Sequence, residues 1–288
     1  MPPLISCAEL FQLCRANPAA VLVVDCSFDL ADPAAGRRAF EAQRIAGAAY
    51  LHLEDALSAP RTGDNGRHPL PAPGAFAQAM RSVGAHDDTL VVACDGADGR
   101  YAARLWWMLR WAGHARVRVL DGGLRRWRAL GLPLESGRQM DSPVARQPGG
   151  FAPRRTLERV ATYEDVLANL QTQAQILLDA RARDRFHGQN ETLDPVAGHI
   201  PGARNRPYRD NLTPEGLLRA PAALRAEFDA LLAGRPADAV IHQCGSGVTS
   251  CHNRLAMEVA GLQGSSMYVG SWSEWIARPA SPVATGAA

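Results

Sequence analysis

The sequence has few of the features that mark several common classes of protein. No stretch approaches 18 uninterrupted apolar residues, so no transmembrane helix is predicted. Residues 1–20 lack a charged region followed by a continuous apolar run, which argues against a signal peptide. The cysteines form no CxxC pair and no regular framework, a pattern that suits free thiols in a reducing compartment. We therefore expect a cytoplasmic protein with no membrane partner.

An excess of charge of either sign is also missing. The chain has 31 basic and 29 acidic residues, a net charge of +2, which gives no electrostatic reason to expect a nucleic-acid partner. All 31 basic residues are arginine, which a high-GC coding bias explains as well as any function does. The 288 residues are 47% hydrophobic and 21% charged, an ordinary globular composition. This length fits two domains of about 130–150 residues, each with its own core.

Apolar, β-rich runs alternate with helical segments in the first half of the chain. Val21–Asp25 (VLVVD), Thr89–Asp95 (TLVVACD) and Arg116–Gly122 (RVRVLDG) each read as a buried strand that ends at a turn. Between them, Pro73–Val83 and Tyr101–Trp111 read as helices. This alternation predicts an α/β fold with a mainly parallel sheet flanked by helices.

The second half repeats this order of segments. Three pairs of runs correspond: Val21–Asp25 with Ile176–Asp179 (ILLD), Val91–Asp95 with Ala239–Cys244 (AVIHQC), and Val119–Gly122 with Ser266–Gly270 (SMYVG). A self-similarity that extends over half the chain has too long a period for a solenoid. It indicates two tandem copies of one fold.

The boundaries of the two copies follow from composition. Ser136–Arg155 is rich in proline, glycine and polar residues and has no periodicity, which is typical of a linker. We expect an N-terminal domain over 1–137, a linker over 138–155 and a C-terminal domain over 156–288. Cys244 in the second copy aligns with Asp95 in the first. We therefore expect the C-terminal copy to be catalytic and the N-terminal copy to be non-catalytic.

Cys244 stands between a predicted buried strand and a predicted helix that begins near Val248. Gly245 and Gly247 let the loop curl, so that its amide N–H groups point at the sulfur, and the helix adds its positive end. Both effects favour the thiolate, which is the nucleophilic form. We predict that Cys244 is catalytic and that Gly245, Gly247, Val248 and Thr249 of its loop contact the substrate. The alternative is a buried structural cysteine beside a glycine turn.

The sequence gives less support to two other functions for this region, a zinc site and a phosphatase loop. His242, Cys244, Cys251 and His252 cluster in the sequence, but their spacing matches no common zinc pattern, so we expect no metal. Some phosphatases place a phosphate-binding arginine six positions after the cysteine, where this chain has the neutral Ser250. Cys251 is expected to pack in the helix, with a role as redox partner as the alternative.

Several motifs match one known family. Residues 244–252 (CGSGVTSCH) closely resemble the active-site loop of 3-mercaptopyruvate sulfurtransferases, whereas thiosulfate-type rhodaneses usually carry charged residues there. Gly198–Ala203 (GHIPGA), Val119–Trp127 (VLDGGLRRW) and Gly270–Trp275 (GSWSEW) match signatures of tandem rhodanese proteins. Over residues 4–280 the chain thus resembles the tandem-domain rhodanese and 3-mercaptopyruvate sulfurtransferase family, which implies two rhodanese-like domains.

The resemblance implies a reaction as well as a fold. In such enzymes the cysteine takes a sulfur atom from a small-molecule donor as a persulfide, and an acceptor then removes it. The implied donor is 3-mercaptopyruvate, with thiosulfate as the alternative. The implied acceptor is a thiol, on a thioredoxin-like protein or a small molecule, or cyanide, and no cofactor is needed. A persulfide carrier or regulatory protein without fast turnover is the alternative from another class.

The resemblance also implies partners for Cys244. Ser246 matches the family serine, His68 in RHPLP matches the histidine, and Glu54 in LHLED falls where a carboxylate from the first domain is expected. Such a series relays a proton to the departing enolate. Asp55 could serve instead of Glu54. The alternative for His68 is an exposed loop histidine beside prolines.

For the substrate carboxylate, the resemblance implies Arg185, whose forked donors fit two oxygens, with Arg181 as a structural neighbour. A second arginine is expected shortly before GHIPGA, but Glu191–Ala197 (ETLDPVA) contains none. The first copy has Arg44–Ala48 (RIAGA) in place of HIPGA, as expected of a non-catalytic copy. Val269 replaces the aspartate usual before GSWSEW, and the sequence offers no interpretation of that change.

Overall fold

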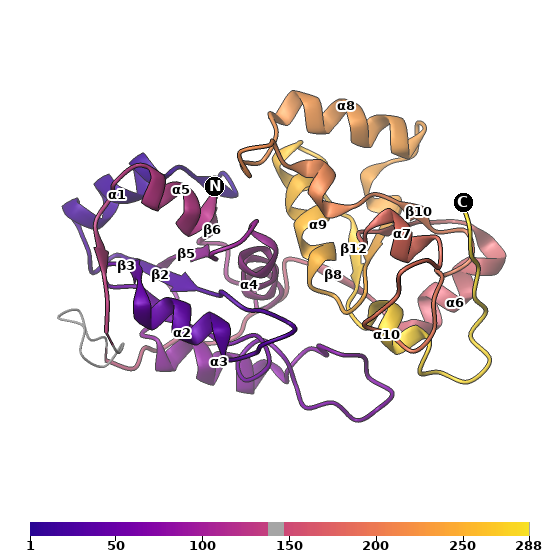
Figure 1. Ribbon diagram of the computed structural model, residues 1–288, viewed down its shortest axis with the longest axis horizontal. Coiled ribbons are helices and arrows are strands. Elements are labelled where there is room, and N and C mark those ends of the chain that lie inside the picture. Colours follow the sequence, from indigo (N-terminus) through magenta and orange to yellow (C-terminus); the bar gives the residue numbers. More distant parts are fainter. Residues whose placement is uncertain (138–146, 288) are drawn as a thin grey trace. The chain divides into compact units, whose positions relative to one another are not determined.

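The computed structural model (Figure 1) describes residues 1–137 and 147–287, and their contacts divide them into two units. The first unit consists of Met1–Ala59, Pro71–Leu157 and Glu215–Leu217, and the second of Pro60–Leu70, Glu158–Pro214 and Leu218–Ala288. The expected domain boundaries stay predictions, and residues 138–146 of the expected linker lie outside the described residues. One short segment, Pro60–Leu70, makes its contacts with the second unit although its neighbours in sequence belong to the first.

The first unit is built on a parallel sheet with the strand order β1-β6-β5-β2-β4. Its strands are β1 (Leu4–Ile5), β2 (Val21–Asp25), β4 (Ala49–Tyr50), β5 (Leu90–Cys94) and β6 (Val117–Leu120). Its helices are α1 (Cys7–Ala16), α2 (Ala35–Ala42), α3 (Pro73–Ser82), α4 (Arg100–Trp111) and α5 (Gly123–Ala129). A small antiparallel pair joins β3 (Arg44–Ile45) to β7 (Leu134–Glu135). Every residue of β2 and β5 is buried, as their uniformly apolar sequences predict for central parallel strands.

The second unit repeats this plan with the strand order β10-β9-β11-β12-β8, again parallel. Its strands are β8 (Arg159–Ala161), β9 (Ile176–Asp179), β10 (Arg204–Asn205), β11 (Val240–Gln243) and β12 (Ser266–Tyr268). Its α-helices are α6 (Tyr163–Thr172), α7 (Arg183–Phe186), α8 (Pro221–Leu232), α9 (Thr249–Val259) and α10 (Ser271–Trp275), and its 3₁₀ helices are η2 (Tyr208–Asn211) and η3 (Ala237–Ala239).

The two sheets confirm the predicted duplication. Reading each sheet from its β4 or β10 edge, β2 corresponds to β9, β5 to β11, β6 to β12 and β1 to β8. These are the pairs of runs that the sequence predicts to be equivalent, and the α/β fold class is confirmed with them. The strand that precedes Asp95 and the strand that precedes Cys244 therefore occupy the same place in equivalent sheets.

Alternating side chains of the second sheet build two cores. Ile176 and Leu178 of β9 pack on one face with residues of α8 and α9, while Leu177 packs on the other face with Trp272 and Trp275 of α10. This follows from the two-residue period of a strand, which points successive side chains to opposite faces. Burial on both faces holds the strand ends, and with them the loops, in fixed positions.

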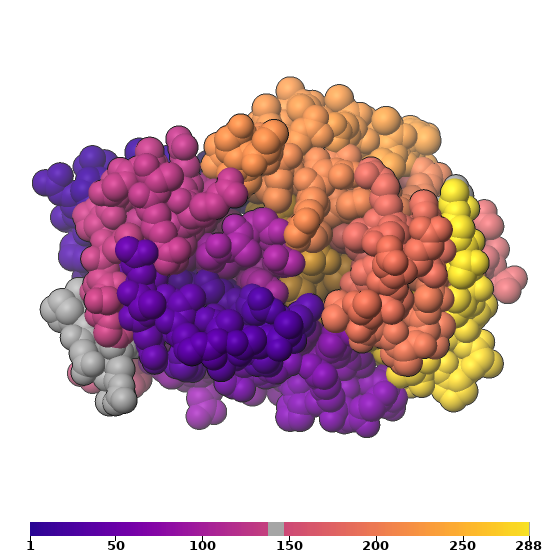
Figure 2. Space-filling view, in the orientation of Figure 1, coloured from indigo at the N-terminus to yellow at the C-terminus, as the bar shows by residue number. Residues whose placement is uncertain are grey.

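The C-terminal tail covers part of the second unit. Ala284 forms an antiparallel bridge with His199, and the N–H of Gly286 donates to the carbonyl of His187 at 3.0 Å. In the space-filling view this yellow tail lies along the salmon surface formed by the segment around residues 183–203 (Figure 2). The tail thus closes the outer side of the GHIPGA segment.

Candidate active site

The Cys244 thiol lies at the carboxyl end of β11, between β9 and β12, and is 1% exposed. Sites in parallel α/β sheets occupy this edge. The backbone N–H of Gly247 donates to the Cys244 sulfur at 3.2 Å. Gly247 has a φ of +76°, and a Cβ there would lie 2.2 Å from the carbonyl oxygen of Val269. Only glycine therefore lets the loop turn its amide toward the sulfur.

Opposing effects set the pKa of the Cys244 thiol. Burial raises it, but the hydroxyl groups of Thr249 and Ser250 and the N–H groups of Ser246 and Ser250 outweigh burial and hold the pKa below its usual 9.0. The Ser250 hydroxyl is buried and has no other hydrogen-bond partner among the described residues, so it is available to the thiolate. Val248, the N-cap residue of α9, supplies no side-chain cap, which leaves the positive end of that helix facing the loop. The site therefore favours the nucleophilic thiolate.

The segment after β12 fixes the loop from the other side. The N–H of Cys244 donates to Ser271 Oγ at 3.1 Å, and its carbonyl accepts from the N–H of Trp272 at 3.0 Å. The carbonyl of Gly245 accepts from the N–H of Ser273 at 2.9 Å. Sequence reasoning took GSWSEW as a mark of the fold and missed this role of its serines. A signal was present, because a serine directly after a buried strand end is placed to bind a neighbouring loop.

His68 belongs to the second unit, in the segment Pro60–Leu70. Its Nδ1 is 2.8 Å from Ser246 Oγ, and the two side chains are 1% and 6% exposed. His68 is therefore not the exposed loop histidine that its flanking prolines allow. The neighbouring N–H of Arg67 donates to Ser273 Oγ at 2.9 Å, which ties the segment Pro60–Leu70 to the loop-holding serines.

Glu54 and Asp55, the two candidates for a carboxylate partner of His68, belong to the first unit. Glu54 belongs to Met1–Ala59, and its expected role beside His68 stays a prediction. Its alternative, Asp55, lies 3.2 Å from the imidazole of His52 and has a side chain 76% exposed. That degree of exposure suits a surface ion pair better than a catalytic carboxylate.

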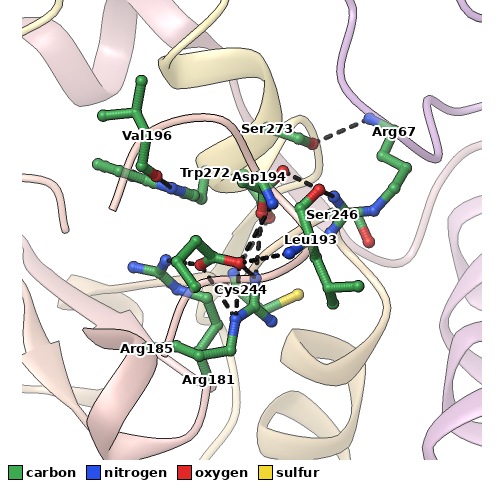
Figure 3. Close-up of polar contacts among 12 residues, drawn as sticks. Arg67, Arg181, Arg185, Leu193, Asp194, Val196, Cys244, Ser246, Trp272 and Ser273 are labelled. Carbon is green, nitrogen blue, oxygen red and sulfur yellow. Dashed lines mark hydrogen bonds and ion pairs between the residues drawn. The ribbon is translucent and has the colours of Figure 1, made fainter. Parts of the chain in front are cut away.

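Arg185 is held by acids from the stretch where a second arginine is expected. Its Nε and Nη2 contact the Glu191 carboxylate at 3.0 and 2.9 Å, and its Nη2 contacts Asp194 Oδ2 at 3.1 Å. The side chains of both acids are 3% exposed, and Figure 3 shows the contact between Arg185 and Asp194. Arg181 is paired with the buried Asp179 at 2.7 Å and lies over the ring of Trp272, as expected of a structural neighbour. Sequence reasoning missed Arg67, whose Nη1 donates to Asp194 Oδ1 at 2.6 Å.

The remaining cysteines and histidines of the C-terminal loop have ordinary partners. Cys251 Sγ donates to the carbonyl of Gly247 at 3.3 Å, and His242 Nε2 lies 3.1 Å from Ser265 Oγ. Burial, together with Arg254, lowers the pKa of His242 to about 3. Within residues 1–137 and 147–287, no group of three or more His, Cys, Asp and Glu is arranged to hold a metal. No helix in these ranges has the length and apolar character needed to cross a bilayer.

Comparison with known proteins places this geometry in a family. A model of the rhodanese-like domain matches residues 8–130 and 162–278. The Pseudomonas aeruginosa protein named "Probable 3-mercaptopyruvate sulfurtransferase" is 45% identical over 268 residues, 92% of this chain and 93% of that protein. Mouse thiosulfate sulfurtransferase is 34% identical over 276 residues, 94% of this chain and 90% of that one. The solved 3-mercaptopyruvate sulfurtransferase of Leishmania major, at 27% identity, matches with a TM-score of 0.82 over 96% of this chain and 75% of its own.

Proposed function

Because the chain belongs to the family of rhodanese-like domain proteins, we propose that it is a sulfurtransferase that moves sulfur from 3-mercaptopyruvate through a persulfide on Cys244. The observation that carries the proposal is the Cys244 thiol itself, whose pKa is lowered in a loop that also holds the Ser246–His68 pair. A structural cysteine would need neither the inward-facing amide nor the hydroxyl–imidazole pair.

The first step is an attack on sulfur. The Cys244 thiolate attacks the thiol sulfur of 3-mercaptopyruvate, an S–S bond forms, and the C–S bond breaks with its electrons on carbon. The leaving group is the enolate of pyruvate, and the thiol hydrogen stays on the transferred sulfur as Cys–S–SH. Ser246 hands its proton to the enolate and recovers one from His68, which supports loss of a poor leaving group.

The second step frees the cysteine. A thiolate acceptor attacks the outer sulfur, takes it as a new persulfide and returns the electrons of the S–S bond to Cys244. Cyanide does the same and leaves as thiocyanate. The N–H of Gly247 stabilises the returning thiolate at 3.2 Å. In this proposal Gly245, Val248 and Thr249 contact the donor, Arg185 binds its acidic group, and Glu54 is our candidate to orient His68.

The choice of donor rests on two features of the site. The loop from Gly245 to Thr249 carries neutral side chains, and a proton donor is useful for an enolate but not for sulfite, the leaving group of thiosulfate. Thiosulfate stays the second candidate because a curated thiosulfate sulfurtransferase is 34% identical. A persulfide carrier without fast turnover is the third.

We also propose a cytoplasmic location and a thiol acceptor, either a thioredoxin-like protein or a small thiol. In support, all six cysteines, each within the described ranges, are free thiols.

The test is a mass spectrum of the protein after donor treatment. We expect the mass of one added sulfur atom, about 32 Da, on the peptide that contains Cys244. Cys251→Ser is the matched control and should keep the adduct, whereas Cys244→Ser should lose it. No adduct on Cys244 would rule out the proposal.

Turnover separates the three candidates. A higher kcat/KM for thiosulfate than for 3-mercaptopyruvate would replace the first candidate by the second. A single equivalent of thiocyanate, formed with excess cyanide and donor, would identify a carrier.

A further inference from the structure

The first unit contains a cavity that the sulfur-transfer chemistry does not use. It has a volume of about 230 Å³ and lies among α1, β2, β3 and α5. The two helices are in contact with each other (Figure 1). All residues that line the cavity belong to the first unit, whereas Cys244 and His68 belong to the second. The cavity therefore shares no residue with the candidate active site.

The floor of this cavity is buried and apolar. Four side chains, each 2–4% exposed, form it: Val21, Val23, Ile45 and Trp127. Phe11 of α1 meets the Trp127 ring edge to face, with the ring centroids 6.3 Å apart. The indole N–H of Trp127 already donates to a backbone carbonyl at 2.9 Å, so it needs no further partner. A floor of this kind favours an apolar group, and its two rings offer an aromatic ligand edge-to-face contacts.

The rim of the cavity carries the one charged side chain of the lining. Arg15, in the last turn of α1, is exposed, and its guanidinium lies 5.6 Å from the centroid of the Phe11 ring. Within residues 1–137 and 147–287, no carboxylate pairs with this guanidinium. The exposed residues Pro18 and Ala46 beside it are neutral. A cation at the mouth of an apolar cavity selects a ligand with an apolar body and an acidic end.

The second unit shows that the shared fold does not dictate this lining. A cavity of about 220 Å³ lies at the corresponding place, between α6 and β9 and beside Pro201 and Gly202 of the GHIPGA segment. Its lining includes five polar side chains: Asn169, Gln173, Gln175, Arg204 and Arg235. There the Arg235 guanidinium donates to the carbonyl of Gln173 at 3.3 Å. The apolar floor and the arginine without a carboxylate partner are therefore properties of the first unit's own side chains.

We propose that the cavity of the first unit binds a small aromatic carboxylate, with its ring on the buried floor and its carboxylate at Arg15. An apolar cavity of about 150 Å³ is enough to hold benzene. A cavity of about 230 Å³ therefore accommodates a ring with a short side chain. Binding is noncovalent and is additional to the binding of a sulfur donor. The half-buried Cys14 lines the same cavity, so its reactivity reports whether the cavity is occupied.

Protection of Cys14 in the full-length protein tests the location of the site. The probe is 3-phenylpropionate, and the readout is the rate at which N-ethylmaleimide modifies the Cys14 peptide, followed by mass spectrometry. Cys14 is the one cysteine of the six that is not buried, and a peptide-level readout separates it from Cys244. At nine-tenths occupancy the rate on Cys14 should fall by about tenfold, by mass action. An unchanged rate up to the solubility limit of the probe would overturn the proposal.

The amide of the same compound, 3-phenylpropionamide, tests the role of charge. Wild type should need about 2- to 5-fold less acid than amide for half protection, the range for an exposed ion pair. Arg15→Met should remove this preference, and Arg15→Gln serves if that variant folds poorly. Arg37→Met is the matched control and should keep the preference, because the exposed Arg37 also lies over a ring, 4.9 Å from the centroid of Tyr50.

Two results would contradict the assignment of the ligand. Equal protection of wild type by acid and amide would show that the cavity does not select an anion. A rate on Cys14 that falls as the protein concentration rises, with no probe present, would show that a second copy of the chain covers the cavity. Neither readout depends on sulfur transfer, so the outcome is independent of the proposed function.

Discussion

The loop after β5 in the first unit and the loop after β11 in the second start from equivalent strands but enclose different groups. In the first unit the Asp95 carboxylate fills its own loop. Its Oδ1 accepts from the N–H groups of Ala97 and Gly99 at 2.9 and 3.0 Å, and its Oδ2 accepts from those of Tyr101 and Ala102 at 3.0 and 3.1 Å. In the second unit the loop amides surround a thiol instead. The shared loop is a ring of backbone donors, and the residue at its centre decides whether that ring is structural or reactive.

The anchoring segments differ in the same way. Gly123 and Ser271 both have a left-handed φ, +54° and +56°, and both sit beside the first residue of their loop. At Gly123 a Cβ would lie 2.5 Å from the carbonyl oxygen of Asp95. Ser271 instead offers its hydroxyl to the N–H of Cys244. The reactive copy therefore has an additional hydrogen bond where the structural copy needs glycine.

Burial alone does not make a cysteine reactive. Cys26 and Cys94 of the first unit are fully buried, and desolvation raises the pKa of each well above 9.0. Cys244 is as deeply buried, yet its pKa is lowered, because hydroxyl and amide donors face it. The hydrogen-bond donors directed at the Cys244 sulfur therefore account for the difference between its pKa and those of Cys26 and Cys94.

Of the changes that test this comparison of the two loops, removal of the Cys244 thiol should have the largest effect on activity. Cys244→Ser should abolish sulfur transfer without unfolding the protein, since a serine hydroxyl at neutral pH cannot hold a stable sulfane sulfur. Cys94→Ser is the matched control in the equivalent strand and should keep activity. Turnover of Cys244→Ser above a few per cent of wild type would mean that another cysteine, Cys251 first, carries the sulfur.

Loss of the imidazole should come next. His68→Ala leaves the loop amides in place but removes the partner of Ser246, so we expect kcat with 3-mercaptopyruvate to fall by about 10²–10⁴-fold. His86→Ala, in the first unit, is the control and should change kcat little. A near-normal kcat in His68→Ala would show that the loop amides alone support the chemistry.

A smaller effect concerns the acids at the ends of β2 and β9. Asp179 is paired with Arg181, whereas Asp25 accepts the N–H of Ser27, and burial raises its pKa to about 6. The unfolded value is about 3.9, so between pH 4 and 6 the folded state binds more protons and its stability rises as pH falls. Asp25→Asn should remove this pH dependence, a change of about 2–3 kcal/mol in the free energy of unfolding between pH 4 and 6, measured by urea unfolding across that window. An identical slope in both proteins would refute the assignment.

The smallest expected effect is a shift in the reactivity of Cys244. In wild type the rate of iodoacetamide alkylation should rise to half its maximum at a pH below 9.0, because the pKa of the thiol is lowered. Ser250→Ala removes one donor and should move this midpoint upward, by less than about one unit for a single hydrogen bond. Ser82→Ala, at an exposed position of α3 in the first unit, is the control. A midpoint that does not move would exclude Ser250 as a donor.

The sequence predicted the elements whose pattern is local. Val21–Asp25 and the equivalent Ile176–Asp179 are short apolar runs that end in an acid, and both are central parallel strands. The glycines around Ser246 predicted a tight loop, and the structure has one. These features depend on neighbours in sequence and on the period of a strand.

What the sequence did not reveal depends on distant partners. His68 and Ser246 are 178 residues apart, and no local pattern shows that the segment around His68 belongs to the second unit. Arg67 contacts Asp194, a residue 127 positions away, so no local pattern could single it out. Ser271 gained its role only when β12 brought it next to Cys244.

The segment Pro60–Leu70 also has a consequence for the order of events during synthesis. Arg67 leaves the ribosome 206 residues before Ser273, the residue that anchors it. At about 5–20 residues per second, that interval lasts roughly 10–40 s. A nascent chain that has completed the first sheet therefore carries a histidine-bearing loop with no docking surface yet made. This loop is where a protease would cut translation intermediates first, and the thiolate site is completed only when nearly all of the chain has been made.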